Sequence, residues 1–323
     1  MQTRSFTASS TTEFTDIGLT GTESTTTEFT DSERVRLLPQ LTLLRRDEHE
    51  IQLGFDSSEA AVLADPDGSV SALLAVMDGR YRRADLATAA SQLGVSAARF
   101  QALLAALTGA GLLEAPNARG HSESTVRLVG LGPAGTQLGE HLLRAGLGRL
   151  LVVDPDRQLP WARWPGERDR IQRTEHWSQP RINDSDLTVI VASCLEVDRA
   201  ISSTLTQADH PHLIVRPRAR GAVVGPLVLP GRTSCLHCGD LARTRTDPAW
   251  PRMLAQLCRI GGDWDPLAAD WAAAMAATQV LGYLAGKPVA SAAATLELGP
   301  SDWQWQRRVW PADPACGCCW SAV

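Results

Sequence analysis

Residues 125–156, TVRLVGLGPAGTQLGEHLLRAGLGRLLVVDPD, decide the fold of this chain. An apolar run is followed by a glycine-rich turn, a helical stretch and a second apolar run that ends in an acid. This order predicts a Rossmann-like unit in which the turn and the acid would meet a nucleotide. The predicted nucleotide-contacting residues are Gly130, Gly132, Gly135 and Asp154. Glycines also let a helix pack closely on a strand without a ligand, so the motif indicates the fold more firmly than the ligand.

The same domain is expected to continue to the C-terminus. Residues 186–194 form another buried apolar run, and residues 210–231 read as two more strands. An Ala-rich helix is expected around 267–285. Strands alternating with helices predict an α/β domain over 125–323 with a largely parallel sheet.

Five of the seven cysteines lie in two short clusters typical of a structural zinc site. Cys235-Leu-His-Cys238 forms one pair, and Cys316-Gly-Cys318-Cys319 supplies the second. Four thiolates in two knuckles suit tetrahedral Zn²⁺ without an open position. An odd count of cysteines fits a disulfide framework poorly. Because Cys316 and Cys319 repeat the two-residue gap, we expect Cys235, Cys238, Cys316 and Cys319 as ligands. Cys318 in place of Cys319, or a set of free buried thiols, is the alternative.

Residues 34–115 are expected to form a separate small domain. Apolar runs predict three strands, at 35–46, 50–55 and 59–65. Cap and stop residues predict three helices, at 69–79, 83–94 and 96–113. Three short strands and three helices of this size suggest a winged helix, and residues 116–124 have the composition of a linker.

The last predicted helix favours a peptide over DNA as the ligand of this domain. It offers only Arg99 and Gln101 among Ala and Leu, whereas helices that contact DNA display several polar and basic side chains. An apolar helix face beside an edge strand instead suits a peptide that adds as an extra strand. The predicted peptide-binding residues are Val62, Leu63, Ala64, Arg99, Phe100, Leu103 and Leu107.

Residues 1–33 differ in composition from the rest of the chain. They are rich in Thr and Ser, and they hold six acids against one Arg. The hexapeptide Thr-Thr-Glu-Phe-Thr-Asp occurs twice, at 11–16 and 26–31. Few bulky apolar residues are available to offset chain entropy, which predicts a disordered acidic tail or a misassigned start. Alternatively, the Phe-bearing repeats mimic a peptide ligand.

Composition restricts the remaining function classes. The net charge of −5 argues against a nucleic-acid partner, because that affinity is largely electrostatic. The sequence contains neither an apolar run long enough to span a membrane nor a secretory signal, so we expect a cytoplasmic protein without a membrane partner. A homodimer is compatible with these properties.

The spacing of LVVDPD (151–156) and GPLVLPGRTSCLHC (225–238) resembles the ThiF/MoeB/E1 superfamily of carboxylate-adenylating proteins. The segment 210–257 is most similar to the E1-like, Ocin-ThiF members of azole-forming (TOMM) and thiopeptide clusters. The resemblance covers about residues 34–320 and includes a PqqD-like front domain. It implies a structural zinc, binding of a precursor leader peptide, and a YcaO-type cyclodehydratase as the partner.

The chain departs from active members of that superfamily where they hold ATP. They carry a Gly-x-Gly-Gly-x-Gly loop, an Asn-x-x-Arg-Gln helix and a downstream Lys, whereas this chain has Pro133 in the loop and Lys287 as its only lysine. Six arginines between 157 and 181 could substitute, form a solvated loop, or contact a partner. We therefore expect a non-catalytic scaffold. ATP binding by an active adenylyltransferase that acts on a peptide or protein carboxylate is the alternative.

Overall fold

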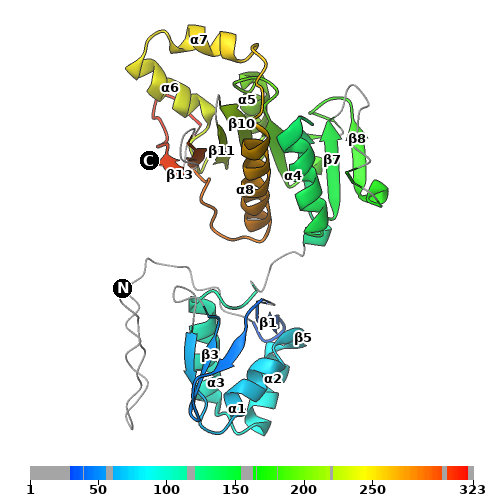
Figure 1. Cartoon of the computed structure of the whole chain (residues 1–323), viewed down its shortest axis with the longest axis vertical. Helices are drawn as coiled ribbons and strands as arrows, with labels where there is room; N and C mark the ends of the chain where they lie inside the picture. The colour runs from blue at the N-terminus through cyan, green and yellow to red at the C-terminus, as the bar shows by residue number, and fades with distance from the viewer. Residues whose placement is uncertain are drawn as a thin grey trace. The chain divides into compact units, whose positions relative to one another are not determined.

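The computed structural model describes residues 30–38, 40–55, 61–114, 121–153, 163–164, 166–179, 181–218, 221–299 and 304–318. The chain divides into two compact units, Met1–Asn117 and Ala118–Val323 (Figure 1). The predicted tail, except for its last four residues, lies outside the described residues. Within those residues, no helix is both long and apolar enough to cross a bilayer.

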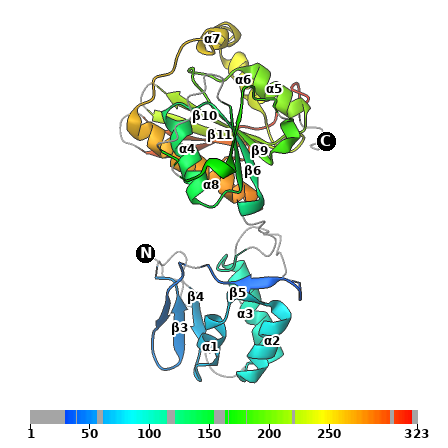
Figure 2. The same ribbon diagram turned by 90° about the vertical axis from the view of Figure 1, so that its right-hand side faces the viewer.

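The first unit contains two small antiparallel sheets and three helices, of which Figure 2 shows β3 and β4 next to α1. Strands β2, β3 and β4 form one sheet in that order, and β1 pairs with β5 in the other. Its strands are β1 Arg34–Arg36, β2 Leu43–Arg45, β3 Glu50–Leu53, β4 Ala61–Ala64 and β5 Asp78–Arg82. Its helices are α1 Ser69–Ala75, α2 Arg83–Gln92 and α3 Ala97–Gly109.

Two sequence predictions for this unit require correction. The single strand predicted over 35–46 is two strands in different sheets, since Pro39 between them has no N–H with which to continue a ladder. The helix predicted over 69–79 ends at Ala75, and Gly79 lies in β5 with φ 88°. The predicted cap of α3 is confirmed, because the Ser96 hydroxyl accepts a hydrogen bond from the Arg99 N–H at 3.3 Å.

The second unit is built on an eight-stranded sheet in the order β13-β12-β11-β10-β9-β6-β7-β8. The strands from β10 to β8 run parallel, and β11, β12 and β13 extend the sheet in antiparallel pairs. The strands are β6 Thr125–Val129, β7 Arg149–Val153, β8 Ile171–Thr174, β9 Leu187–Val191, β10 His212–Arg218, β11 Gly221–Val228, β12 Ala294–Leu298 and β13 Trp305–Val309.

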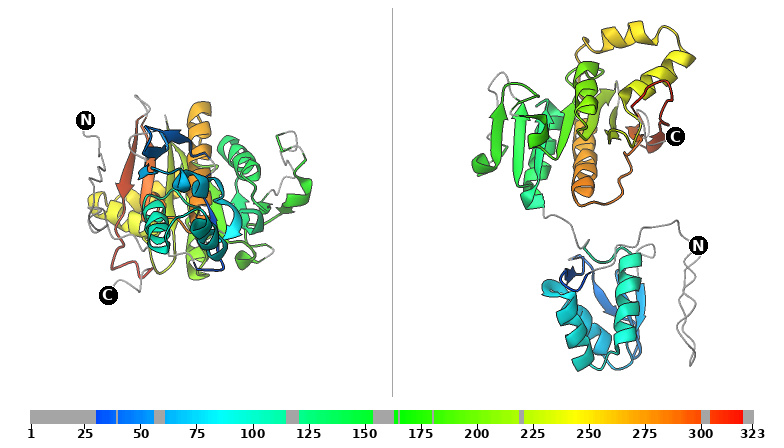
Figure 3. Two further views of the ribbon diagram at one scale, coloured as in Figure 1. Left: turned by 90° about the horizontal axis from the view of Figure 1, so that it is seen from below. Right: turned by 180° about the vertical axis from the view of Figure 1, so that it is seen from behind.

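Helices cover both faces of this sheet, as Figures 2 and 3 show. Helices α4 and α8 pack against each other over one face, and the buried Ala side chains of α8 allow this close approach. Side chains of α5 and α6 share an apolar cluster with β9 and β10 on the other face. The helices are α4 Pro133–Arg144, α5 Arg199–Gln207, α6 Leu236–Thr246, α7 Trp250–Leu257 and α8 Pro266–Leu284. The predicted α/β architecture of this unit is therefore confirmed.

Candidate functional site

The glycine-rich turn lies at the topological switch point of the sheet. It follows β6, from which the chain continues outward through β7 on one side and through β9 on the other. A Cβ on Gly130 would lie 2.1 Å from the Val191 carbonyl oxygen, and one on Gly135 would lie 2.0 Å from the Gly130 oxygen. Packing alone therefore requires these two glycines, whereas a Cβ on Gly132 would meet open space.

The first turn of α4 offers fewer phosphate donors than its position in the fold would suggest. Pro133 is its first residue and has no N–H, and the Thr136 N–H already bonds to the Gly132 carbonyl at 2.9 Å. The N–H groups of Ala134 and Gly135 remain at this helix end. Asp154, the predicted ribose contact, lies outside the described residues.

Two arginines of the crossover after β7 are held by groups away from the glycine-rich turn. Arg163 forms an ion pair with Glu140 of α4 at 3.2 Å. Arg170 pairs with Glu167 at 3.1 Å and donates to the Leu143 carbonyl at 2.5 Å. These contacts tie the crossover after β7 to α4 and occupy the two guanidinium groups.

Lys287 lies near the end of β6 that is opposite the glycine-rich turn. Burial, and secondarily the charge of Lys287, lower the pKa of His121, which lies shortly before β6 begins. The glycine-rich turn follows the other end of β6, and a five-residue strand spans about 17 Å. Lys287 is therefore poorly placed to contact phosphates at the turn.

Trp164 is a structural residue of this region that sequence reasoning missed. Its side chain is 1% exposed, and its indole N–H donates to the Thr136 carbonyl at 3.1 Å. A Cβ on Gly139 would lie 2.5 Å from this ring, so the small residue makes room for it. A Trp in a basic loop gave no signal of burial, whereas the spacing of Gly135 and Gly139 on one helix face could have suggested a close neighbour.

Four thiols form a compact cluster between the start of α6 and the end of the chain. Among the described residues, Cys235, Cys238, Cys316 and Cys318 have their Sγ atoms within 4.8 Å of one another. The Sγ–Sγ distances are 3.5 Å from Cys235 to Cys316 and 3.3 Å from Cys238 to Cys318. Tetrahedral Zn²⁺ with bonds of about 2.3 Å separates its sulfur ligands by roughly 3.8 Å, so the set is compatible with zinc.

The fourth member of the cluster among the described residues is the cysteine that the sequence offered as the alternative. Cys318 lies with the other three thiols, and the predicted Cys319 lies outside the described residues. The Asp313 N–H donates to the Cys238 Sγ at 3.3 Å, a contact suited to a thiolate. Hydrogen bonds, first from Cys235 and also from this N–H, lower the pKa of Cys238 despite burial. Cys258 instead donates to the Val197 carbonyl at 3.3 Å.

Strand β4 has a free outer edge within the described residues, since it pairs only with β3. The Asp65 N–H donates to the His49 carbonyl at 2.7 Å, and this bond fixes which residues of β4 direct their backbone groups toward β3. The N–H and C=O groups of Val62 and Ala64 therefore point away from β3. Arg99 of α3 donates to the Ala64 carbonyl at 2.9 Å, so this side chain lies at one end of the edge.

The predicted apolar lining of a peptide groove is wrong for three residues of α3. Phe100, Leu103 and Leu107 are 1%, 7% and 1% exposed and belong to the unit's own core. A domain this small has one apolar stripe on each helix, and its core uses that stripe. Of the predicted residues, Val62, Leu63, Ala64 and Arg99 remain accessible or half-buried.

Comparison with known proteins shows that other solved structures share this fold. No protein-family model and no curated protein matches the chain. The solved structure of E. coli MccB aligns with 88% of this chain and 96% of its own, at 13% identity and a TM-score of 0.59. MccB has also been solved with ATP, and with AMPCPP and MccA.

The heterocyclase TruD aligns with 89% of this chain but 43% of its own, at 16% identity and a TM-score of 0.57. At these identities the likeness shows a shared fold. The chain therefore shares its overall fold, which includes a Rossmann-like sheet, with MccB and with part of TruD.

Proposed function

We propose that this protein binds the leader of a ribosomally made precursor peptide and presents it to a YcaO-type cyclodehydratase for azoline and thiazole formation. It performs no adenylation itself. The free edge of β4, with Arg99 at its end, carries this proposal. The front unit acts as a winged-helix, PqqD-like recognition domain. A leader segment adds to the edge as a fourth strand.

The edge supplies affinity through the backbone and selectivity through Arg99. Besides the Ala64 carbonyl, which already accepts from Arg99, the two outward residues Val62 and Ala64 offer three backbone groups, each worth about 0.5–1.5 kcal/mol net when paired. The Arg99 guanidinium has donors beyond the one used on Ala64, which suits an acidic leader. Arg99 mainly positions the ligand, because the backbone hydrogen bonds to β4 do not depend on the amino-acid sequence of the peptide.

The nucleotide turn supports a scaffold over an enzyme. Acyl adenylation requires cations around the reacting phosphates. Arg163 pairs with Glu140, and Arg170 pairs with Glu167. Lys287 lies near His121, at the end of β6 opposite the glycine-rich turn. We therefore assign the turn to packing.

The thiol cluster would hold structural zinc through Cys235, Cys238, Cys316 and Cys318. Four thiolates complete a tetrahedral shell and leave no position for water or substrate. The ion would fix the C-terminal segment onto α6, and this rigid domain would dock the partner enzyme. Presenting the substrate on a docked subunit raises its effective concentration at the partner's active site. The names of the fold relatives are in keeping with peptide modification, since TruD is a heterocyclase and MccB is a microcin C7 biosynthetic enzyme.

Titration calorimetry of the full chain with the leader encoded beside its gene tests the proposal. Val62→Pro removes an outward N–H and should weaken binding about tenfold, equivalent to one or two lost hydrogen bonds. Leu43→Pro is the matched control. It removes an outward N–H from β2, at the opposite edge of the same sheet.

Two results would contradict the proposal. Equal weakening by both proline variants would show that the β4 edge is not the binding site. Peptide-dependent pyrophosphate exchange by this chain alone would show that it is an adenylating enzyme.

A further inference from the structure

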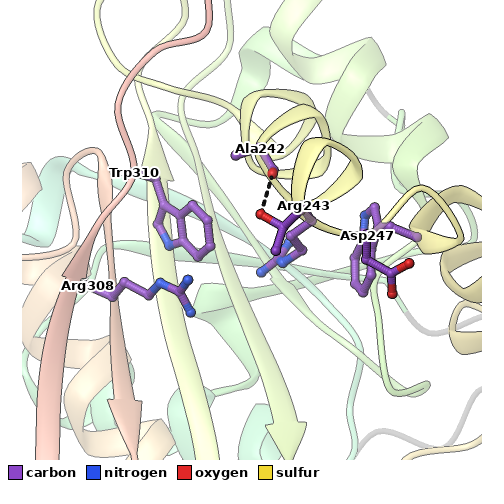
Figure 4. A pocket seen from close by; sticks show the side chains of 7 residues that line it. Ala242, Arg243, Asp247, Arg308 and Trp310 are labelled. Atoms are coloured by element: carbon purple, nitrogen blue, oxygen red, sulfur yellow. Dashed lines mark hydrogen bonds between the residues drawn. The ribbon is translucent and has the colours of Figure 1, made fainter.

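A cavity of about 270 Å³ lies between α6, the start of α7 and the residues around β13 (Figure 4). Arg243, Asp247, Trp250, Arg308 and Trp310 are among its lining residues. This size is below the roughly 300–1,000 Å³ of typical small-molecule sites and suits a single large side chain.

The cationic and aromatic side chains of this cavity form an alternating stack. The Arg243 Cζ lies 4.8 Å from the ring centroids of both Trp250 and Trp310, and the Arg308 Cζ lies 4.3 Å from that of Trp310. Figure 4 shows Arg243 reaching in from α6, with Arg308 and Trp310 opposite. An aromatic ligand would therefore meet both indole and guanidinium surfaces.

The cavity carries more positive than negative charge. Arg243 is 3.7 Å from Asp240, but that carboxylate already accepts two hydrogen bonds from Arg199, at 2.7 and 3.0 Å. Among the described residues, Arg308 has no carboxylate within ion-pair distance. Asp247 is the one acid in the lining, and it accepts a hydrogen bond from the Ala249 N–H. Two guanidinium groups thus face one carboxylate.

Strand β13 provides an open sheet edge beside the cavity. It is the last strand of the eight, and no described strand pairs with its outer side. The Trp310 N–H bonds to the Ala293 carbonyl, and the Gly299 N–H bonds to the Gln304 carbonyl. Backbone groups alternate along the strand, so those of Trp305, Arg307 and Val309 point outward. Trp305 and Val309 are 53% and 57% exposed.

We propose that β13 and this cavity together bind an extended acidic peptide that carries an aromatic residue. The peptide adds antiparallel to β13, with its aromatic side chain opposite Arg308 and inserted into the cavity. Acids one and two positions away then lie near Arg307 and Arg308. A second copy of β13 is disfavoured, because antiparallel pairing centred on Arg307 would place two guanidinium groups opposite each other. This site is separate from the β4 edge and does not depend on leader binding there.

A fluorescein-labelled peptide of residues 9–18, SSTTEFTDIG, has this chemistry and serves as the probe. Its binding is measured by anisotropy against the full chain carrying Phe14→Ala and Phe29→Ala, so that the chain's own repeats do not compete. Saturable binding is expected, falling about tenfold when the peptide's Phe is replaced by Ala and when its acids are amidated.

Two protein variants locate the site, and a third is the control. Arg308→Gln removes the unpaired charge, and Val309→Pro removes an outward N–H without breaking the β12 ladder. Each should weaken the probe about tenfold, whereas Arg252→Gln on the exposed side of α7 should not. Thermal unfolding of each variant checks its fold. No saturable binding, or binding that both variants leave unchanged, overturns the proposal.

Discussion

Two buried histidines should make this protein sensitive to mild acid. His210 and His212 are 2% and 0% exposed, and His212 is the first residue of β10. His212 Nδ1 donates to the His210 carbonyl at 3.0 Å, so its Nε2 accepts from the Ser202 hydroxyl at 2.9 Å. His210 Nε2 lies 3.0 Å from the Thr188 hydroxyl. These contacts fit neutral rings.

Burial, as the largest cause, lowers the pKa of each histidine from 6.5 to about 4, and the charge of Arg127 adds to the effect at His210. Between pH 6.5 and about pH 4, both imidazoles are protonated in the unfolded chain but remain neutral in the folded chain. The free energy of unfolding therefore falls as the pH drops below 6.5. From pH 8 to pH 5 each histidine should remove about 2 kcal/mol, and the pair about 4 kcal/mol.

Urea unfolding at pH 8 and pH 5 measures this loss. The double variant His210→Gln, His212→Gln removes both titrations, so its loss between the two pH values should be smaller than that of the parent chain by about 4 kcal/mol. The exposed His176→Gln is the control and should behave like the parent. An equal loss in the parent and the double variant would refute the reasoning, whatever the stability of the variant at pH 8.

Three further predictions test the thiol cluster, the glycine turn and the role of β4. Cys318→Ser should weaken zinc retention more than about tenfold, whereas Cys319→Ser should retain one equivalent of zinc by mass spectrometry. The reverse result would favour Cys319 as the fourth ligand, as the two-residue gap to Cys316 predicts. Gly135→Ala should destabilise the chain by about 1–3 kcal/mol in thermal melts, because its Cβ would meet the Gly130 carbonyl at 2.0 Å. Gly132→Ala, which meets open space, should melt like the parent; equal effects would indicate that packing does not select these glycines. Val62→Ala keeps the backbone donor and should leave leader affinity within about threefold, so a larger loss would assign binding to the side chain.

The sequence predicted the second unit well because its signals are local. A buried strand, a glycine turn and an amphipathic helix follow one another within residues 125–156, and the structure has β6, α4 and β7 there. The close approach of Gly135 to Gly130 explains why the turn could be recognised without knowledge of a ligand. The winged-helix assignment of the first unit remains a prediction.

The features that the sequence could not supply depend on distant contacts. The apolar periodicity of α3 is equally compatible with a core face and a binding face, and only the packed unit shows that Phe100 is buried. The pairing of β1 with β5 joins short strands separated by some forty residues, for which no local pattern exists. The stack of Arg243, Trp310 and Arg308 likewise joins α6 to the end of the sheet.

With zinc bound, the thiol cluster would also link two parts of the chain that lie far apart in sequence. Cys238 and Cys318 are 80 residues apart. Joining chain ends at that separation lowers the conformational entropy of an unfolded chain, with a TΔS of about 4–5 kcal/mol at 25 °C. The enclosed loop contains α7, α8, β12 and β13, so a bound ion would add to the stability that α8 and β12 already gain from the core of the second unit. Oxidation of those sulfurs would release the ion and with it this link, so residues 238–318, about a quarter of the protein, are expected to become less stable under oxidising conditions.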